Sequence, residues 1–339
     1  MNKEVLEITP SGGIYCIVNL PKPAVTTHDF SKPSGYPIQE LLEQIRLDHI
    51  SSNSFLTDGD ILRWGLARIC ETQIGRALAH DARFDDWMVV IEDGENASKC
   101  FIDTDIQCLF LPRGAQSSAD FSRSQQHQME FLFHFGKGLR LIWQFGMEGS
   151  KAQFLEPKDF LLFQRLTEAD SDLSAILLAY QLREAGDHDL WRYILSADLS
   201  AIAVTLCECL DFDSSMDGLL EALGFVFQDW FANEERLARI DHDSLSDLDE
   251  KQDEHGSQNL QFDDLIQLSM LPDGFSYLEY AAAEILSDAY YIRMTDATNE
   301  AHLNQILAET QIHMLEDIGF RDQELAKKFF PHSTFETIV

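Results

Sequence analysis

Two histidines and a glutamate are spaced so that one helix could present all three to a metal ion. At 100° per residue, His127, Glu130 and His134 fall on one helix face, within an arc of roughly 80°. Lys137 and Leu141 share that arc. Measured from position 137, His134, Glu130 and His127 lie about 4.5, 10 and 15 Å along the axis, so a zinc ion would need ligands from a second helix. Polar residues on an amphipathic helix are the simpler interpretation.

Acidic residues on the next predicted helix could supply such ligands. Glu168 and Asp172 lie one turn apart on the same side of it. Asp170 differs because it borders the apolar stripe of the helix, where an unpaired carboxylate is costly. We therefore predict a buried salt bridge from Asp170 to Lys137 or Arg140 of the first helix.

Gly136 and Gly138 stand in the middle of that first helix. Each glycine costs about 0.8–1.0 kcal/mol relative to alanine inside a helix, so some gain should offset the pair. The glycines could let another backbone approach closely, leave room for a ligand, or break the helix near 136–138. The sequence leaves these explanations open.

The elements that must position these residues change in kind along the chain. Three short runs rich in β-branched and aromatic residues predict a small antiparallel sheet over about 86–112, and an earlier run predicts a strand at 13–20. The acidic, polar stretch 241–256 lacks helical spacing and predicts a solvated loop. The predicted helices cover residues 37–45, 58–80, 120–145, 157–185, 188–195, 198–210, 215–232, 259–270, 276–294, 297–318 and 321–330.

Together these elements predict an α+β protein that is mostly α-helical. A small antiparallel sheet precedes a zincin-like two-helix core, and a C-terminal helical region follows it. We expect one domain over residues 1–215 and a helical region over 216–339, which can pack as one unit with the first. A sheet, a helix with metal ligands and a second helix that returns an acidic ligand is the plan of zinc-dependent peptidases.

Four segments carry a more specific resemblance: GLRLIWQ (138–144), LEPKDFLLFQRLTEADSD (155–172), FQDWFANEERLARID (227–241) and LPDGFSYLEY (271–280). They resemble a bacterial family of proposed zincin-like metallopeptidases of otherwise unknown function. In that family a helix with a HExRHxWQ-like motif is followed by an acidic helix of Glu-Ala-Asp type. The resemblance extends over residues 85–290.

The motif of this family is degenerate here. With its Trp-Gln pair set on residues 143–144, the resemblance places the two zinc-binding histidines at Lys137 and Leu141 and the catalytic glutamate at Gly138. A lysine ammonium and a leucine offer no lone pair to a metal, and glycine has no carboxylate to activate water. The classical site is therefore expected to be inactive.

The acidic helix keeps its carboxylates. Glu168 resembles the family's acidic metal ligand. The predicted salt bridge of Asp170 would then take the metal's structural place, and no cofactor is predicted. Zinc would require a non-standard ligand set drawn from His127, Glu130, His134, Glu168 and Asp172.

The composition limits the partners. With 58 Asp and Glu residues against 25 Lys and Arg, the formal net charge is −33, which repels phosphate backbones and anionic membranes. Direct nucleic-acid binding and membrane binding are therefore not expected. Six scattered cysteines without a CxxC pair, and an N-terminus unlike a secretory signal, predict a cytoplasmic protein.

Three functions agree with these observations. The preferred one is a catalytically inactive zincin-like protein, a pseudoenzyme that acts as a binding or regulatory module for an unknown protein or peptide. The second is an active metal-dependent hydrolase or peptidase with the non-standard ligands. The third is an acidic protein-interaction module or nucleic-acid mimic. The degenerate motif argues against an enzyme.

Overall fold

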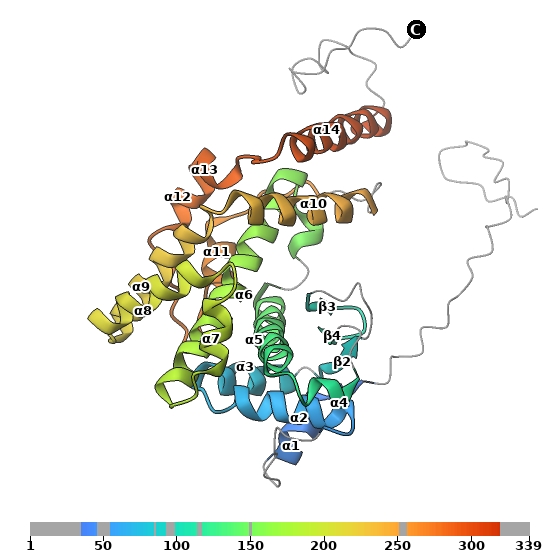
Figure 1. The fold of residues 1–339 in the computed structure, drawn as a ribbon. Helices are drawn as coiled ribbons and strands as arrows, with labels where there is room; N and C mark the ends of the chain where they lie inside the picture. The colour runs from blue at the N-terminus through green and yellow to red at the C-terminus, as the bar shows by residue number, and fades with distance from the viewer. Residues whose placement is uncertain are drawn as a thin grey trace, which may run out of the picture. The chain divides into compact units, whose positions relative to one another are not determined.

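Two long helices, α5 (Gln125–Glu148) and α6 (Pro157–Glu184), pack against each other at the centre of the computed structural model (Figure 1). The structure describes residues 35–45, 55–84, 86–92, 99–113, 117–148, 151–250 and 256–318. These residues belong to one compact unit, Ser34–Val339. The strand predicted at 13–20 and the helix predicted at 321–330 lie outside the described residues.

Among the described residues the small sheet has four strands, and it is mixed, which corrects the antiparallel prediction. Its order is β1-β2-β4-β3, and β2 and β4 pair in parallel. The reason is that β4, an unbroken apolar run, is buried as a central strand, whereas the three-residue β3 folds back onto it as an edge strand. The strands are β1 (Tyr36–Pro37), β2 (Met88–Glu92), β3 (Phe101–Asp103) and β4 (Cys108–Pro112).

Shorter helices surround the central pair. Figure 1 shows α2 and α3 beneath α5, and α10 and α14 towards the other end of α6. The predicted α+β, mostly α-helical fold class is confirmed. The elements are α1 (Ile38–Ile45), α2 (Asp58–Ile69), α3 (Gln73–Phe84), α4 (Ser118–Phe121), the 3₁₀ helix η1 (Lys151–Phe154), α7 (Asp189–Leu195), α8 (Ser200–Phe212), α9 (Met216–Trp230), α10 (Glu234–Glu250), α11 (Phe262–Leu268), α12 (Ala282–Ser287), α13 (Ala289–Ile292) and α14 (Ala297–Ile318).

The prediction of a loop at 241–256 is wrong for residues 241–250, which belong to α10. Leu237, Asp241, Leu245 and Leu248 are all buried, at the spacing of one helix face. The acidic residues between them hid this spacing. Asp241 is buried because it pairs with Arg165 of α6, with Nε to Oδ1 at 2.6 Å and Nη2 to Oδ2 at 2.7 Å.

Two helices predicted as continuous are interrupted by capping residues. The predicted helix 58–80 divides into α2 and α3, because the Thr72 hydroxyl donates to the Ile69 carbonyl and accepts from the Gly75 N–H. The predicted helix 276–294 divides at Asp288, whose carboxylate accepts from the Tyr290 N–H and caps α13. In both places a short polar side chain competes with the helical hydrogen bonds.

Close packing explains one of the two glycines of α5, Gly138, but not Gly136. The helix runs without a break through both positions. A Cβ on Gly138 would lie 2.5 Å from Leu109 Cδ1 of β4, so glycine lets the helix approach the sheet. A Cβ on Gly136 would meet Leu178 of α6 at an ordinary 3.4 Å.

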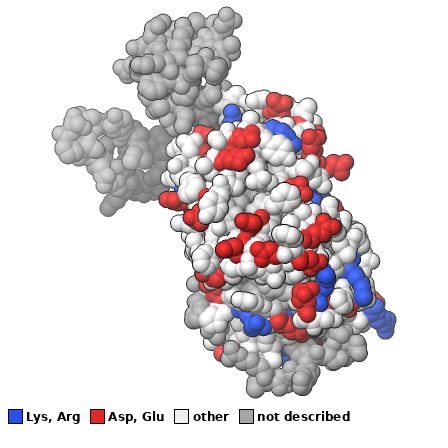
Figure 2. All heavy atoms as spheres, turned by 90° about the vertical axis from the view of Figure 1, so that its left-hand side faces the viewer, with Lys and Arg blue, Asp and Glu red and all other residues white. Residues whose placement is uncertain are grey.

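The surface is acidic, as the net charge requires. Figure 2 shows Asp and Glu side chains over much of one face, with Lys and Arg gathered mainly near one edge of it. Within the described residues, every helix is too short or too polar to cross a membrane.

Candidate functional site

Lys137 lies at the contact between α5 and α6, between two carboxylates. Its Nζ is 2.6 Å from Asp172 Oδ1 and 2.7 Å from Glu168 Oε2. Burial lowers the pKa of Lys137, but the charges of Asp172 and Glu168 outweigh burial and raise the pKa above its ordinary value. The side chain is therefore a permanent cation at physiological pH.

The two carboxylates differ in their ionisation. Burial raises the pKa of Glu168, yet the charge of Lys137 outweighs burial and holds that pKa below its ordinary value. For Asp172 burial wins, and the charge of Glu168 adds to it, so its pKa is raised despite Lys137. Trp230 Nε1 donates to Asp172 Oδ2 at 3.0 Å. Glu168 therefore keeps its negative charge to a lower pH than Asp172 does.

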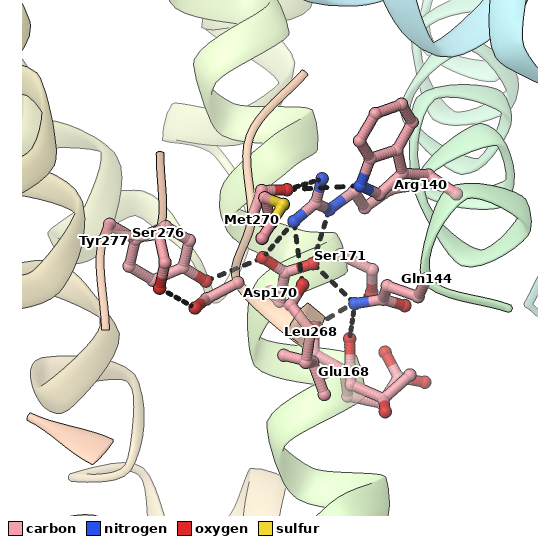
Figure 3. A network of polar contacts seen from close by, with 12 residues as sticks. Arg140, Gln144, Glu168, Asp170, Ser171, Leu268, Met270, Ser276 and Tyr277 are labelled. Atoms are coloured by element: carbon pink, nitrogen blue, oxygen red, sulfur yellow. Dashed lines mark hydrogen bonds and ion pairs between the residues drawn. The ribbon is translucent and has the colours of Figure 1, made fainter. Parts of the chain in front are cut away.

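Asp170 faces a different set of partners, which Figure 3 shows converging on it. Arg140 donates to both of its oxygens, from Nε at 2.6 Å and from Nη2 at 3.0 Å. Gln144 Nε2 donates to Oδ2, and the Tyr277 hydroxyl donates to Oδ1 at 2.7 Å. We call Asp170, Arg140, Gln144 and Tyr277 the Asp170 network. It joins α5, α6 and the segment after α11.

Arg140 also connects this network to the backbone at the end of α11 and directly after it. Its Nη1 donates to the Met270 carbonyl at 2.8 Å, and its Nη2 donates to the Leu268 carbonyl at 2.9 Å. Trp143 Nε1 donates to the same Met270 oxygen at 3.2 Å. The structure therefore divides the two bases considered for Asp170: Arg140 pairs with Asp170, and Lys137 pairs with Glu168 and Asp172.

A cavity of about 630 Å³ lies beside Glu168. It is bounded by β3, α5, η1, α6 and α10, and Leu141 and Gln144 line it from α5. Two of the lining residues, Gln144 and Thr167, each have a buried side-chain oxygen, Oε1 and Oγ1, without a hydrogen-bond partner among the described residues. A volume of this size is within the usual range of ligand sites.

Within the described residues, no hydrogen bond or ion pair joins the two histidines considered as ligands to these carboxylates. His127 Nδ1 contacts Glu130 Oε2 at 3.4 Å on the exposed start of α5. His134 is further along the helix; burial, and then the charge of Lys137, lower its pKa to about 4. Its Nδ1 has no hydrogen-bond partner among the described residues. The five candidate ligands therefore do not form one cluster.

Zinc does not fit the donor set at this site. The ammonium of Lys137 already lies between Glu168 and Asp172, and Leu141 offers no donor atom. At Gly138 a side chain would run into Leu109. In the described part of the chain, no three His, Cys, Asp or Glu side chains gather as a metal-binding group.

Residues 120–278 match the model of the "Putative metallopeptidase family (DUF6782)". No curated protein and no solved structure matches this chain. The match runs from the end of α4 through most of the segment between α11 and α12, and so includes the whole Asp170 network. Arg140, Trp143 and Gln144, the residues that the expected resemblance aligns with a HExRHxWQ-like motif, all contact Asp170 or the Met270 carbonyl.

Sequence reasoning missed the partners that come from distant segments. Tyr277 is 107 residues from Asp170, and Trp230 is 58 residues from Asp172, so helical spacing could not reveal either contact. A usable signal did exist, because both residues lie within the segments that carry the family resemblance. The cavity lining from β3 and α10 had no signal in the sequence.

Proposed function

We propose that this protein is a non-catalytic binding module, built on a metallopeptidase-type core, that receives a segment of a protein or peptide in the cavity beside Glu168. The observation that carries the proposal is the position of the Lys137 ammonium, in contact with both Glu168 and Asp172.

An ammonium supplies the positive charge of a metal ion but not its chemistry. A catalytic zinc keeps one coordination position for a water molecule and lowers the pKa of that water. Lys137 Nζ can only donate hydrogen bonds, and the carboxylates of Glu168 and Asp172 accept them. The general base is also missing, because position 138 packs on Leu109. The charges of Glu168 and Asp172 are thus compensated by Lys137, but the site has no group that could activate water.

The cavity suits an extended segment of a partner. Within the described residues, the edge strand β3 pairs with β4 alone, so its other edge can accept hydrogen bonds from a peptide backbone. Phe101 and Ile102 of that strand line the cavity, and Leu141 and Phe163 add apolar surface from the central helices. Such a mixture of apolar walls and a few polar atoms is typical of binding sites.

The proposal is tested first for catalysis, with the purified full chain. We expect less than one bound zinc per ten chains by mass spectrometry, and no cleavage of casein or of a mixed peptide library with zinc added. Cleavage that a chelator abolishes, and that Glu168→Gln also abolishes, would show an active metallopeptidase and overturn the proposal.

Binding is tested by selecting ligands from a random heptapeptide display library. Leu141→Arg should block the cavity and abolish binding of the selected peptides. Leu195→Arg is the matched control, because Leu195 is exposed on α7, away from the cavity. Equal binding to both variants would place the binding surface elsewhere and contradict the proposal.

A further inference from the structure

Helix α8 presents large apolar side chains to the solvent. Phe212, the last residue of the helix, is 94% exposed, and Val204, about two turns earlier, is 43% exposed. At 100° per residue the two positions lie about 80° apart around the helix axis and about 12 Å apart along it. They therefore form an apolar stripe on one face of the helix, the pattern of a helix that packs against another element.

The opposite face of α8 already packs against the protein. Helix α8 contacts α7 and α9, and Figure 1 shows α8 and α9 side by side at the left-hand edge of the molecule. The buried residues of α8 are Ile202, Ala203, Leu206 and Leu210. Among the described residues, neither Val204 nor Phe212 belongs to the hydrophobic core or packs against it. The stripe is thus free to contact another molecule.

Met216 extends this apolar surface at the turn between α8 and α9. It is the first residue of α9 and is 42% exposed. The turn is tight, because a Cβ on Gly218 would lie 2.4 Å from the Asp213 carbonyl oxygen. Met216 and Phe212 therefore lie at the same end of the hairpin. A flexible methionine side chain adapts its shape to a partner, and methionines are common at binding surfaces.

The hairpin carries negative charge only. From residue 193 to residue 235 the chain contains nine Asp and Glu residues and no Lys or Arg. Two of these acids, Glu208 and Asp211, are exposed on the same face of α8 as Val204 and Phe212. Figure 2 views the molecule from the side of this hairpin and shows Asp and Glu side chains among uncharged ones. The apolar stripe therefore lies in an acidic surrounding.

The charges of this face select the partner. Glu208, Asp217 and Glu221 form no ion pair with the described residues. Asp211 interacts with the charge of Arg183 from α6, which compensates one carboxylate of the face and leaves the others. A second copy of this chain, a nucleic acid and an anionic membrane would all be repelled. A partner that covers the stripe must therefore combine apolar side chains with positive charges.

We propose that the exposed face of α8 binds a basic amphipathic helix of a protein partner. Apolar side chains of the partner helix cover Val204, Phe212 and Met216, and its Lys or Arg side chains pair with Glu208 and Asp211. Helix α8 has 13 residues, so the contact extends over about 20 Å, or three to four turns of the partner helix.

This surface is separate from the cavity of the proposed function. No lining residue of that cavity belongs to α8 or α9 in the described part of the chain. The two proposals therefore stand or fail independently, and the protein could hold two segments at once.

The test uses a fluorescent helical peptide, acetyl-LKKLLKLLKKLLKL-amide, whose leucines gather on one helix face. A second peptide has the same residues in an order that spreads the leucines around the helix, so that only the pattern differs. We expect the first peptide to bind the full chain about tenfold more tightly by fluorescence anisotropy in about 0.15 M NaCl. Equal binding would mean that charge alone attracts both peptides, and would overturn the inference.

A double variant tests the apolar stripe. Val204→Ser with Phe212→Ser should weaken binding of the amphipathic peptide about tenfold. The unfolding temperature should stay unchanged, because both side chains lie outside the core. Phe275→Ser is the matched control, since Phe275 is 54% exposed in the segment after α11, and it should leave the affinity unchanged. A double variant that binds as tightly as the wild type would place the peptide elsewhere and overturn the inference.

A second double variant tests the charges. Glu208→Gln with Asp211→Asn should weaken binding about fivefold and reduce its dependence on salt. Asp263→Asn with Glu300→Gln removes two exposed carboxylates from α11 and α14 and should leave the affinity unchanged. Equal losses in these two variants would show attraction to the net charge of the protein and contradict a defined surface.

Three other occupants or sites can be recognised, and each would overturn the inference. Loss of peptide binding in Leu141→Arg would place the peptide in the cavity of the proposed function. Self-association of the wild type that Val204→Ser with Phe212→Ser abolishes, measured by sedimentation velocity, would make a second copy the occupant. Sedimentation with phosphatidylcholine vesicles that the same variant abolishes would make a membrane the occupant.

Discussion

At the scale of single residues, Lys137 bridges a buried carboxylate, that of Asp172, and a partly buried one, that of Glu168. Replacing it with methionine keeps the stem but leaves Glu168 and Asp172 facing each other without a cation. We expect Lys137→Met to lower the free energy of unfolding by about 3–5 kcal/mol at pH 7. Urea unfolding of the variant and the wild type measures this difference.

The loss should shrink when the pH is lowered. Without Lys137, the folded-state pKa values of both carboxylates rise above their unfolded-state values, so protonation stabilises the folded variant as the pH falls towards 5. Lys158→Met serves as the control, because Lys158 is exposed on α6 and should change stability by less than about 0.5 kcal/mol. Equal losses in the two variants would contradict a special role of Lys137.

His134 gives the wild type a pH dependence of its own. Burial and the nearby Lys137 lower its pKa from 6.5 to about 4, so the folded state binds the proton less readily than the unfolded state does. We therefore expect the contribution of His134 to stability to be highest above about pH 6.5 and to decrease by about 3 kcal/mol as the pH falls to 4.

The variant His134→Gln tests this assignment by urea unfolding at pH 7, 6, 5 and 4. It should flatten the stability profile within that window. His188→Gln should not, because His188 is exposed at the start of α7 and its side chain makes no capping hydrogen bond. A profile that keeps its slope in His134→Gln would assign the pH dependence to other groups.

How far the sequence predicts the site depends on the range of each contact. The burial of Asp170 beside a base could be inferred, because its neighbours on the helix are apolar. Which base it contacts could not be inferred, since both bases lie one turn apart on α5 and the choice depends on how the helices cross. Contacts to Trp230 and Tyr277 need the tertiary fold.

At the scale of elements, the two glycines of α5 should respond in opposite directions to alanine. Gly138→Ala pushes a methyl group against Leu109, which is fully buried, and should cost about 1–2 kcal/mol after the gain in helix propensity. Gly136→Ala meets Leu178 at ordinary contact distance and should stabilise by about 0.5–1 kcal/mol. Thermal and urea unfolding compare the two variants.

A double variant checks the cause. If the clash with Leu109 is responsible, Gly138→Ala should cost less in a Leu109→Ala background than in the wild type, because the methyl group then enters the space vacated. Additive costs would mean that the glycine is needed for another reason.

Helix α10 depends on its buried ion pair with α6. Asp241→Asn leaves the Arg165 guanidinium buried without its counter-charge and should cost about 3–5 kcal/mol in urea unfolding. Asp243→Asn, two residues along the same helix, breaks a half-exposed pair with Lys99 and should cost less than about 1 kcal/mol. Similar costs for both would show that burial does not decide the strength of these pairs.

Helices were predicted from spacing wherever their faces are plainly apolar, as in α6 and α14. The error at α10 has a physical cause: its inward face includes Asp241 and Ser244, which are buried by pairing and packing, so composition alone suggested a solvated loop. The directions of the strands could not be predicted from the sequence either. Strand β2 pairs with β4, although β3 lies between them along the chain.

At the scale of the whole molecule, the net charge of −33 should make stability depend on ionic strength. Raising NaCl from 0.05 to 0.5 M screens the repulsion between surface carboxylates, and we expect the unfolding temperature to rise by roughly 3–6 °C. Tetramethylammonium chloride should give a similar rise. A rise with sodium alone would indicate specific cation binding and contradict general screening.

The Asp170 network also determines when the central helices can fold during translation. A nascent chain that has reached residue 260 contains Arg140 and Asp170, but neither the Met270 carbonyl, 130 residues after Arg140, nor the Tyr277 hydroxyl, 107 residues after Asp170. Until that last segment leaves the ribosome, two buried charges lack half of their hydrogen bonds. The segment around residues 268–277 is thus the point in translation at which the central helices can close, and a chain cut short before it should remain a substrate for chaperones and proteases.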